Sequence, residues 1–265
     1  MAEWAVPGRH GTVEGMLVND LWVVIGLALL PGLGNLAGGM VAEFVRTTPR
    51  LLNLALHAAS GIVIGVVAIE LMPEALQKLA GWWIALALAA GGLAYVGLEA
   101  LIEAKLENKA GGGAMWMIYI AVAIDVSGDG VMIGSGSAVS TSLAVVLAAG
   151  QLLADFPEGY SVVANLREKS VSRGKRIGVS LSFPLYCLAA ALTAWFLLRD
   201  APDAAKYVAL SFVAGLLTTA AVEDIMNEAH KAAGDTRASS LAIIGGFTLF
   251  ALVSAGLETV MAGGK

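Results

Sequence analysis

Long apolar stretches separated by short polar breaks run along the whole chain. Most stretches have 20 or more residues, and an α-helix needs about 20 residues to cross roughly 30 Å of hydrocarbon. Several breaks contain Gly or Pro, as turns do, including Thr47–Pro49 and Lys109–Gly113. The pattern predicts eight membrane-spanning helices, which we place at Leu17–Arg46, Leu51–Leu79, Trp82–Leu106, Ala114–Ser137, Thr141–Arg167, Gly174–Leu198, Ala205–Lys231 and Ser239–Met261.

The composition agrees with a chain that lies mostly in lipid. Of the 265 residues, 58% are hydrophobic and only 14% are charged, whereas about a quarter of a soluble domain is charged. The single Cys187 excludes an intramolecular disulfide framework. We therefore expect an all-α integral membrane protein built as a bundle of eight transmembrane helices. Residues 1–16 would be an extracytoplasmic N-terminal segment, and residues 17–265 a single transmembrane transport domain.

The Lys and Arg residues predict how this bundle is oriented. Eleven of them follow the first, third, fifth and seventh spans, and five lie on the other side with both termini. Positive residues accumulate on cytoplasmic loops. We therefore expect a multi-pass protein of the cell membrane, the inner membrane in a bacterium, with both termini extracytoplasmic.

Acidic residues inside the fourth and fifth spans are the first candidates for chemistry. Asp125 and Asp129 are four residues apart, and Asp155 and Glu158 are three apart, so each pair shares a helical face. An ionisable side chain in hydrocarbon costs at least about 2.5–3.5 kcal/mol. No Lys, Arg or His lies in the interior of either span. The four carboxylates must bind cations, hold protons or face a water-filled cavity, and a metal site between spans four and five is the interpretation that we favour.

Two further features bear on this site. Pro157 and Gly128 predict a break in each of the two acidic helices, where freed carbonyl groups would add oxygen ligands. In the simplest alternative, the four acids share protons and line a polar interface between helices.

Spans two and seven carry the remaining ionisable candidates. We consider them as residues of an entrance, an exit or a gate: Glu223, Asp224, Glu228, His230, Glu70 and His57. For His57, packing against a neighbouring carbonyl is an equal alternative. For Glu228 and His230, an ordinary solvated helix end is the alternative.

Four segments resemble the ZIP family of divalent metal ion transporters. ADFPEG (Ala154–Gly159) is similar to the fifth-helix motif of that family, and IDVSGDG (Ile124–Gly130) to a degraded form of its fourth-helix motif. ELMPEAL (Glu70–Leu76) resembles the end of the second helix, and the ED…NEAH run beginning at Glu223 resembles a seventh-helix region. Eight spans and outward termini also agree with the family.

The resemblance implies roles for individual residues. Asp125 takes the place of a histidine ligand, and Asp129 that of the motif glutamate. Asp155 and Glu158 match acidic ligands, and Glu158 would bridge two metals together with Asp129. Glu223 and Asp224 fall where the family has a gating pair.

Three departures from the family reduce the number of ligands. Val126 replaces a ligand asparagine, Ala154 a Gln or His, and Phe183 a glutamate that some bacterial members have on the sixth helix. No nitrogen ligand remains in the central site. An all-oxygen site suits Mn²⁺, and also Fe²⁺, better than Zn²⁺.

From these observations we expect a divalent metal cation transporter that moves Zn, Fe or Mn towards the cytoplasm. The metal ion is the substrate, and no organic cofactor is expected. Its partners would be the lipid bilayer and metal ions, with a homodimer left open and no nucleic acid. Metal affinity should fall as pH falls, because protons compete for the carboxylates.

Three other functions are weighed against this expectation. The chain could be a proton-coupled carrier of another solute, or a non-transporting ZIP-like metal sensor or binding protein. We do not expect an enzyme. The Gly-x-Gly-Asp pattern of intramembrane aspartyl proteases fails at Val126, and no HExxH metalloprotease motif is present.

Overall fold

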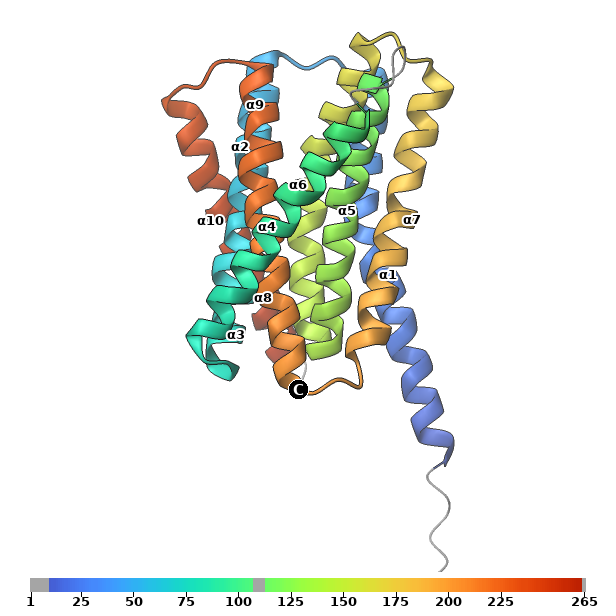
Figure 1. The fold of residues 1–265 in the computed structure, drawn as a ribbon, viewed down its shortest axis with the longest axis vertical. Helices are drawn as coiled ribbons and strands as arrows, with labels where there is room; N and C mark the ends of the chain where they lie inside the picture. The colour runs from blue at the N-terminus through green and yellow to red at the C-terminus, as the bar shows by residue number, and fades with distance from the viewer. Residues whose placement is uncertain (1–9, 107–112, 264–265) are drawn as a thin grey trace, which may run out of the picture.

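The computed structural model describes residues 10–106 and 113–263, and these form an all-helical bundle (Figure 1). Residues 1–9 of the predicted N-terminal segment lie outside the described part. The helices are α1 (His10–Phe44), α2 (Pro49–Gly65), η1 (Val66–Leu71), α3 (Met72–Lys78), α4 (Gly81–Leu106), α5 (Gly113–Val139), α6 (Thr141–Glu168), α7 (Arg173–Leu198), α8 (Asp203–Ala220), η2 (Ala221–Ile225), α9 (Met226–Ala232) and α10 (Arg237–Gly263).

Two of the long segments contain a π-helical stretch. Helices α2, η1 and α3 form one continuous segment, and α8, η2 and α9 form another. Within the described residues, eight long helical segments result, and seven of them begin and end within two residues of the predicted bounds. The exception is α1, which begins at His10 rather than at Leu17.

Six of these segments are long and apolar enough to cross a membrane. They are Asp20–Phe44, Pro49–Lys78, Gly81–Ile102, Arg173–Leu198, Asp203–Ala232 and Arg237–Gly263. Helices α5 and α6, which carry the four central acids, are of similar length but are not among them. The protein therefore has the character of a multi-pass membrane protein.

Capping residues mark the turns as the sequence suggests. Thr48 accepts a hydrogen bond from the backbone N–H of Leu51, with Pro49 at the first position of α2. Ser140 alone separates α5 from α6, and its hydroxyl accepts from the N–H of Leu143 at 3.1 Å. Because this connection is one residue long, α5 and α6 pack side by side in opposite directions.

The packing places α6 at the centre. It packs against α1, α2 and α5, while the other main helix pairs are α5 with α7, α2 with α10, α4 with α8 and α1 with α7. Helices α4 and α10 are the most peripheral, with only 17% of their apolar windows buried. Acids on α5 and α6 are thereby kept away from the surface that lipid would cover.

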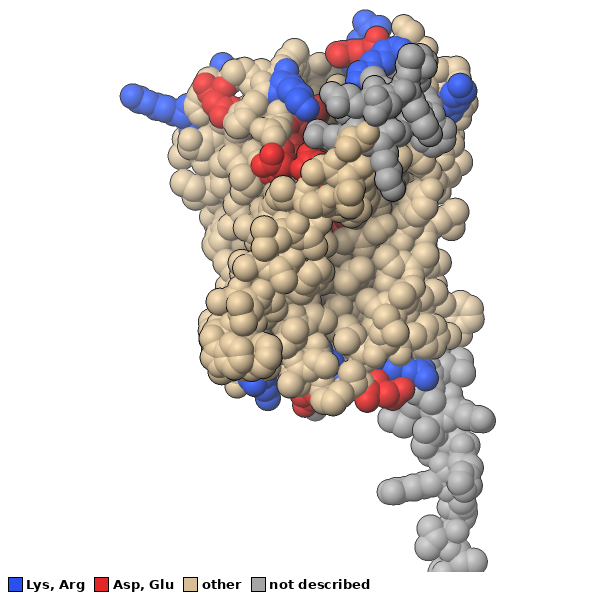
Figure 2. All heavy atoms as spheres, in the orientation of Figure 1, with Lys and Arg blue, Asp and Glu red and all other residues tan. Residues whose placement is uncertain are grey.

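Charged side chains gather at the two ends of the bundle (Figure 2). We call the end with the α1–α2, α6–α7 and α9–α10 connections the upper end, and the other the lower end (Figure 1). The first described residues of α1 and the C-terminus lie towards the lower end. Among the connections and helix ends with described side chains, the upper end has nine Lys and Arg residues and the lower end three. Arg9, Lys105, Lys109 and Lys265 fall outside this comparison because their side chains are not described.

An ion pair ties α1 to α7 at the upper end. Arg176 donates from Nε to Glu43 Oε1 at 2.5 Å and from a terminal nitrogen to Glu43 Oε2 at 2.7 Å. Arg173 lies 3.6 Å from the same carboxylate. Glu43 is far from both arginines in the sequence, so this ion pair could not be predicted from residue spacing.

Candidate metal centre

Four acidic residues meet where α5 packs against α6. Asp125 and Asp129 lie one turn apart on α5, and Asp155 and Glu158 lie one turn apart on α6. Each is at most 9% exposed. Asp125 is within hydrogen-bonding reach of Glu158, and Asp129 of Asp155. The fold therefore brings together the four residues predicted as the site, which we call the carboxylate cluster.

The expectation of broken helices at the cluster is wrong. Helix α6 continues through Pro157, and α5 continues through Gly128. A proline removes one backbone hydrogen bond, and the turns on either side of it keep their own. The irregular stretches are instead the π-helical η1, which contains Glu70, and η2, which contains Glu223 and Asp224. Short π stretches within α-helices occur frequently at functional sites.

Two amides that the sequence analysis missed extend the cluster on its deeper side. Gln151 lies one turn before Asp155 on α6, and its amide donates to Asp129 Oδ1. Asn35 of α1 lies beside Asp155, and both of its amide atoms are buried. The sequence offered one signal for Gln151, because it lies four residues before Asp155 and so shares a helical face with it. The position of Asn35 follows from the packing of α1.

Several oxygen atoms of this group have no hydrogen-bond donor. Among the described residues, Asp129 Oδ2, Asp155 Oδ2 and Gln151 Oε1 are buried without a partner, as are both amide atoms of Asn35. A buried polar atom left unpaired costs about 1–3 kcal/mol. Ionised carboxylates only accept hydrogen bonds, so facing pairs require a shared proton or a cation between them.

Glycine residues allow α1 to approach the cluster. A Cβ on Gly159 would come within 2.0 Å of the carbonyl oxygen of Asn35, and one on Gly38 within 1.9 Å of that of Phe156. Only glycine permits two helix backbones to approach this closely. The Gly of the Pro-Glu-Gly motif therefore has a packing role that sets the position of Asn35.

A cavity of about 440 Å³ opens onto one side of the cluster. Asp125 and Glu158 line it, whereas Asp129 and Asp155 lie behind them. The remaining polar side chains of its wall come from α4, α6, η2 and α9: Tyr95, Glu99, Ser161, Asn165, Glu223, Asp224, Asn227, Glu228 and Lys231. Because Asn165 and Lys231 lie near the upper ends of α6 and α9, the cavity extends from the cluster towards the upper end.

Hydrogen bonds fix two of the predicted gating residues in the wall of this cavity. Tyr95, which is buried on α4, donates to Asp224. Glu228 accepts from Ser161 at 3.1 Å and also from Asn165. The structure thus places Asp224 and Glu228 in one cavity with the cluster, together with the exposed Glu223.

Glu70 lies apart from the cluster. It is buried in η1, where Ser254 of α10 donates to its carboxylate, and its acidic neighbours are Glu74 and Glu258. Glu74 lies in α3, which ends at the lower-end connection to α4, and Glu258 lies in the lower part of α10. The structure therefore does not bring Glu70 into the cavity that opens towards the upper end.

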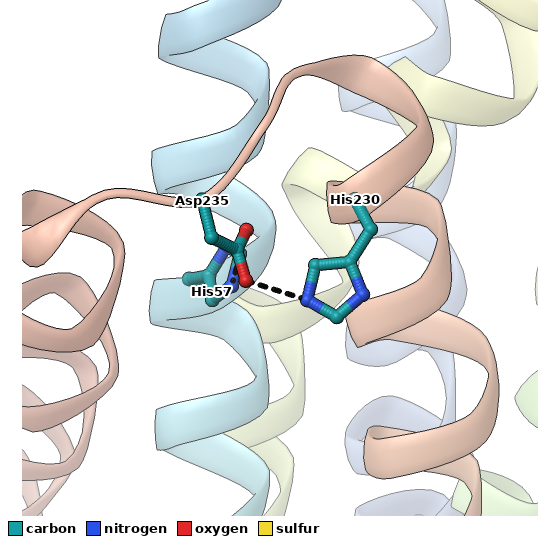
Figure 3. A group of neighbouring side chains, drawn as sticks. All are labelled: His57, His230 and Asp235. Atoms are coloured by element: carbon teal, nitrogen blue, oxygen red, sulfur yellow. Dashed lines mark ion pairs between the residues drawn. The ribbon is translucent and has the colours of Figure 1, made fainter.

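His57 and His230 also form a separate group, with Asp235 of the α9–α10 connection between them (Figure 3). His57 Nε2 lies 3.4 Å from one oxygen of Asp235, and His230 Nε2 lies 2.7 Å from the other. Desolvation acts to raise the pKa of Asp235. A hydrogen bond from Asn53 and the positive charges of the two histidines, when these are protonated, outweigh it and hold this pKa below its ordinary value. Sequence reasoning missed Asp235, which falls in the short break between the seventh and eighth predicted spans.

Two positions at which the ZIP-like pattern loses a ligand are part of the apolar core. Val126 and Phe183 are fully buried and belong to one small hydrophobic cluster with Cys187 and Leu166. They supply packing between α5, α6 and α7. The polar groups that the structure adds to the cluster are instead the amides of Asn35 and Gln151.

Neither the family models nor the curated proteins with which the chain was compared give a match. The fold has the character of a multi-pass helical membrane protein, and it encloses a buried acidic centre between α5 and α6.

Proposed function

We propose that this protein is a divalent metal cation transporter with eight membrane spans, in which α5 and α6 are the two innermost. One observation carries the proposal. Two buried carboxyl pairs face each other between α5 and α6, beside amide and carboxylate oxygens that have no donor among the described residues. The ZIP-like pattern of Ala154–Gly159 supports the same function from the sequence.

The chemistry of the ligands favours a hard divalent ion. The cluster and its neighbouring amides offer only oxygen ligands, which suit Mn²⁺, and Fe²⁺ to a lesser degree, better than they suit Zn²⁺. Four carboxylates exceed the charge of one divalent ion by two. Either a second ion binds or some of the carboxylates retain a proton when one ion is present.

The two sides of the cluster differ in a way that suits alternating access. On the upper side, the cavity connects Asp125 and Glu158 to Glu228. On the lower side, the adjacent turns of α5 and α6 carry the fully buried Met132, Ile133 and Leu147. The Lys and Arg excess at the upper end would place that end in the cytoplasm. The conformation described here would then be open to the cytoplasm, with both termini outside.

Uptake of Mn²⁺ into proteoliposomes tests the proposal. We expect the wild-type protein to accelerate uptake and Asp155→Asn to abolish the acceleration. Glu74→Gln, which removes an acid outside the cluster and its cavity, should retain it. Binding of Mn²⁺ without uptake would instead indicate a sensor or binding protein, and proton flux without metal dependence would indicate a carrier of another solute.

A further inference from the structure

The group at His57, His230 and Asp235 differs in chemistry from the carboxylate cluster. It offers two imidazole nitrogens and one carboxylate, and its ligand atoms all lie within 4.8 Å of one another. The three residues come from α2, α9 and the connection to α10, and their functional groups converge on one point (Figure 3). We call this set the histidine group.

The buried His57 has its ligand atom fixed by a hydrogen bond. Its Nδ1 lies 2.8 Å from the backbone carbonyl oxygen of Asn53, which can only accept. When the ring is neutral, its proton is therefore on Nδ1, and Nε2, 3.4 Å from Asp235, presents a lone pair. Metal-binding histidines are characteristically oriented in this way, with the second ring nitrogen donating to a carbonyl.

Facing acceptors leave a place for a cation. The Nε2 lone pair of His57 and a carboxylate oxygen of Asp235 lie 3.4 Å apart, and both are acceptors while His57 is neutral. An edge of about 3.3 Å is expected between ligands of a tetrahedral Zn²⁺ ion with bonds of about 2.0–2.1 Å. The 2.7 Å contact of His230 with Asp235 is shorter than this edge. The exposed His230 side chain would move outward when the ion enters.

Asn53 holds the arrangement from behind. Its buried side-chain amide donates to the carbonyl groups of Ala229 and Ala233 and to Asp235. Ser239 donates to its oxygen at 2.8 Å. This one residue therefore joins α2 to the end of α9 and to the carboxylate, as a supporting residue behind a metal ligand does.

We propose that His57, His230 and Asp235 form a second divalent metal site, selective for an imidazole-preferring ion such as Zn²⁺. His230 and Asp235 are each about half exposed, which leaves room for water as a fourth ligand. The neighbours Leu56 and Lys231 line the cavity of the carboxylate cluster. The site thus lies beside the upper opening of that cavity, and it shares no ligand with the cluster.

Cobalt binding to the purified full-length protein tests this site, because Co²⁺ in a tetrahedral nitrogen and oxygen site absorbs visible light strongly. We expect one equivalent of such absorption, displaced by Zn²⁺ and retained in excess Mn²⁺. His230→Ala and Asp235→Asn, both at exposed positions, should each raise the Kd at least about 10-fold. His10→Ala, which removes the third histidine of the chain from the opposite end of the bundle, should leave binding unchanged.

The result is independent of the transport proposal. Asp155→Asn should lose Mn²⁺ uptake and keep the Co²⁺ absorption, so failure of either proposal is visible separately. Unchanged Co²⁺ absorption in His230→Ala and Asp235→Asn would overturn the second site. The group would then be a hydrogen-bonded clamp on the α9–α10 connection.

Discussion

Gly159 of α6 lies directly against the backbone of Asn35 of α1. A Cβ built on Gly159 would come within 2.0 Å of the Asn35 carbonyl oxygen and 2.6 Å of its carbonyl carbon. Both contacts are with backbone, which cannot move aside as the end of a flexible side chain can. Gly159 follows Glu158 of the carboxylate cluster in the sequence, and it also determines how closely α1 approaches that cluster.

Replacing Gly159 with Ala should separate α1 from α6. We expect a loss of about 1–3 kcal/mol in stability, as overpacking of a tight interior causes. Thermal unfolding in detergent measures the difference. Gly178→Ala on α7 is the matched control, because a Cβ there meets nothing within 4 Å. Equal melting temperatures for the two variants would show that the α1–α6 contact is looser than described.

The buried amide of Gln151 should contribute to metal affinity. We expect Gln151→Leu to weaken Mn²⁺ binding by about 10–100-fold, because Asp129 loses its donor and the cluster loses an oxygen atom. Calorimetric titration of the purified protein measures this change. Gln77→Leu changes the other glutamine, which is exposed on α3, and should bind as the wild type does. Unaltered affinity in Gln151→Leu would remove this residue from the site.

Binding of Mn²⁺ should weaken as pH falls from about 8 to 5. The acids of the cluster and of its cavity wall are Asp125, Asp129, Asp155, Glu158, Glu99, Glu223, Asp224 and Glu228. Protons that these acids share without metal must leave when metal binds, so acid favours the metal-free form. Calorimetry in buffers of different ionisation enthalpy would measure the protons released. A pH-independent affinity with no proton release would contradict the prediction.

The ion pair of Glu43 and Arg176 should stabilise the upper end of the bundle. Glu43→Gln leaves the buried guanidinium of Arg176 without its charged partner, and we expect a cost of about 1–3 kcal/mol in thermal unfolding. Asp200→Asn is the control, because Asp200 pairs with Arg199 on the exposed lower end. An equal loss of stability in Asp200→Asn would mean that the buried Glu43–Arg176 pair stabilises the protein no more than an exposed pair does.

Much of the fold could be predicted from the sequence, because hydrophobic length and turn residues are local signals. Pro49, Ser140 and the connection after Glu168 fix helix ends that the pattern located within two residues. The acids of the cluster were also visible locally, since their spacing places each pair on one helical face.

Residues supplied by long-range packing were not predictable in this way. Asn35 reaches Asp155 only because α1 lies against α6, and Asp235 reaches His57 only because α10 returns beside α2. The π-helical η2, which carries Asp224, contains no proline or glycine from which an irregular helix could have been predicted. Pro157, in contrast, suggested a break, whereas α6 continues through it.

Anomalous scattering from crystals soaked in Mn²⁺ tests the central claim most directly. We predict a peak between α5 and α6, with carboxylate oxygens of Asp129, Asp155 and Glu158 around it. The peak should vanish in Asp155→Asn and persist in Glu74→Gln. A cluster that shows no anomalous density in any Mn²⁺ soak, with its carboxyl groups at hydrogen-bond distance from one another, would contradict a cation site at this position.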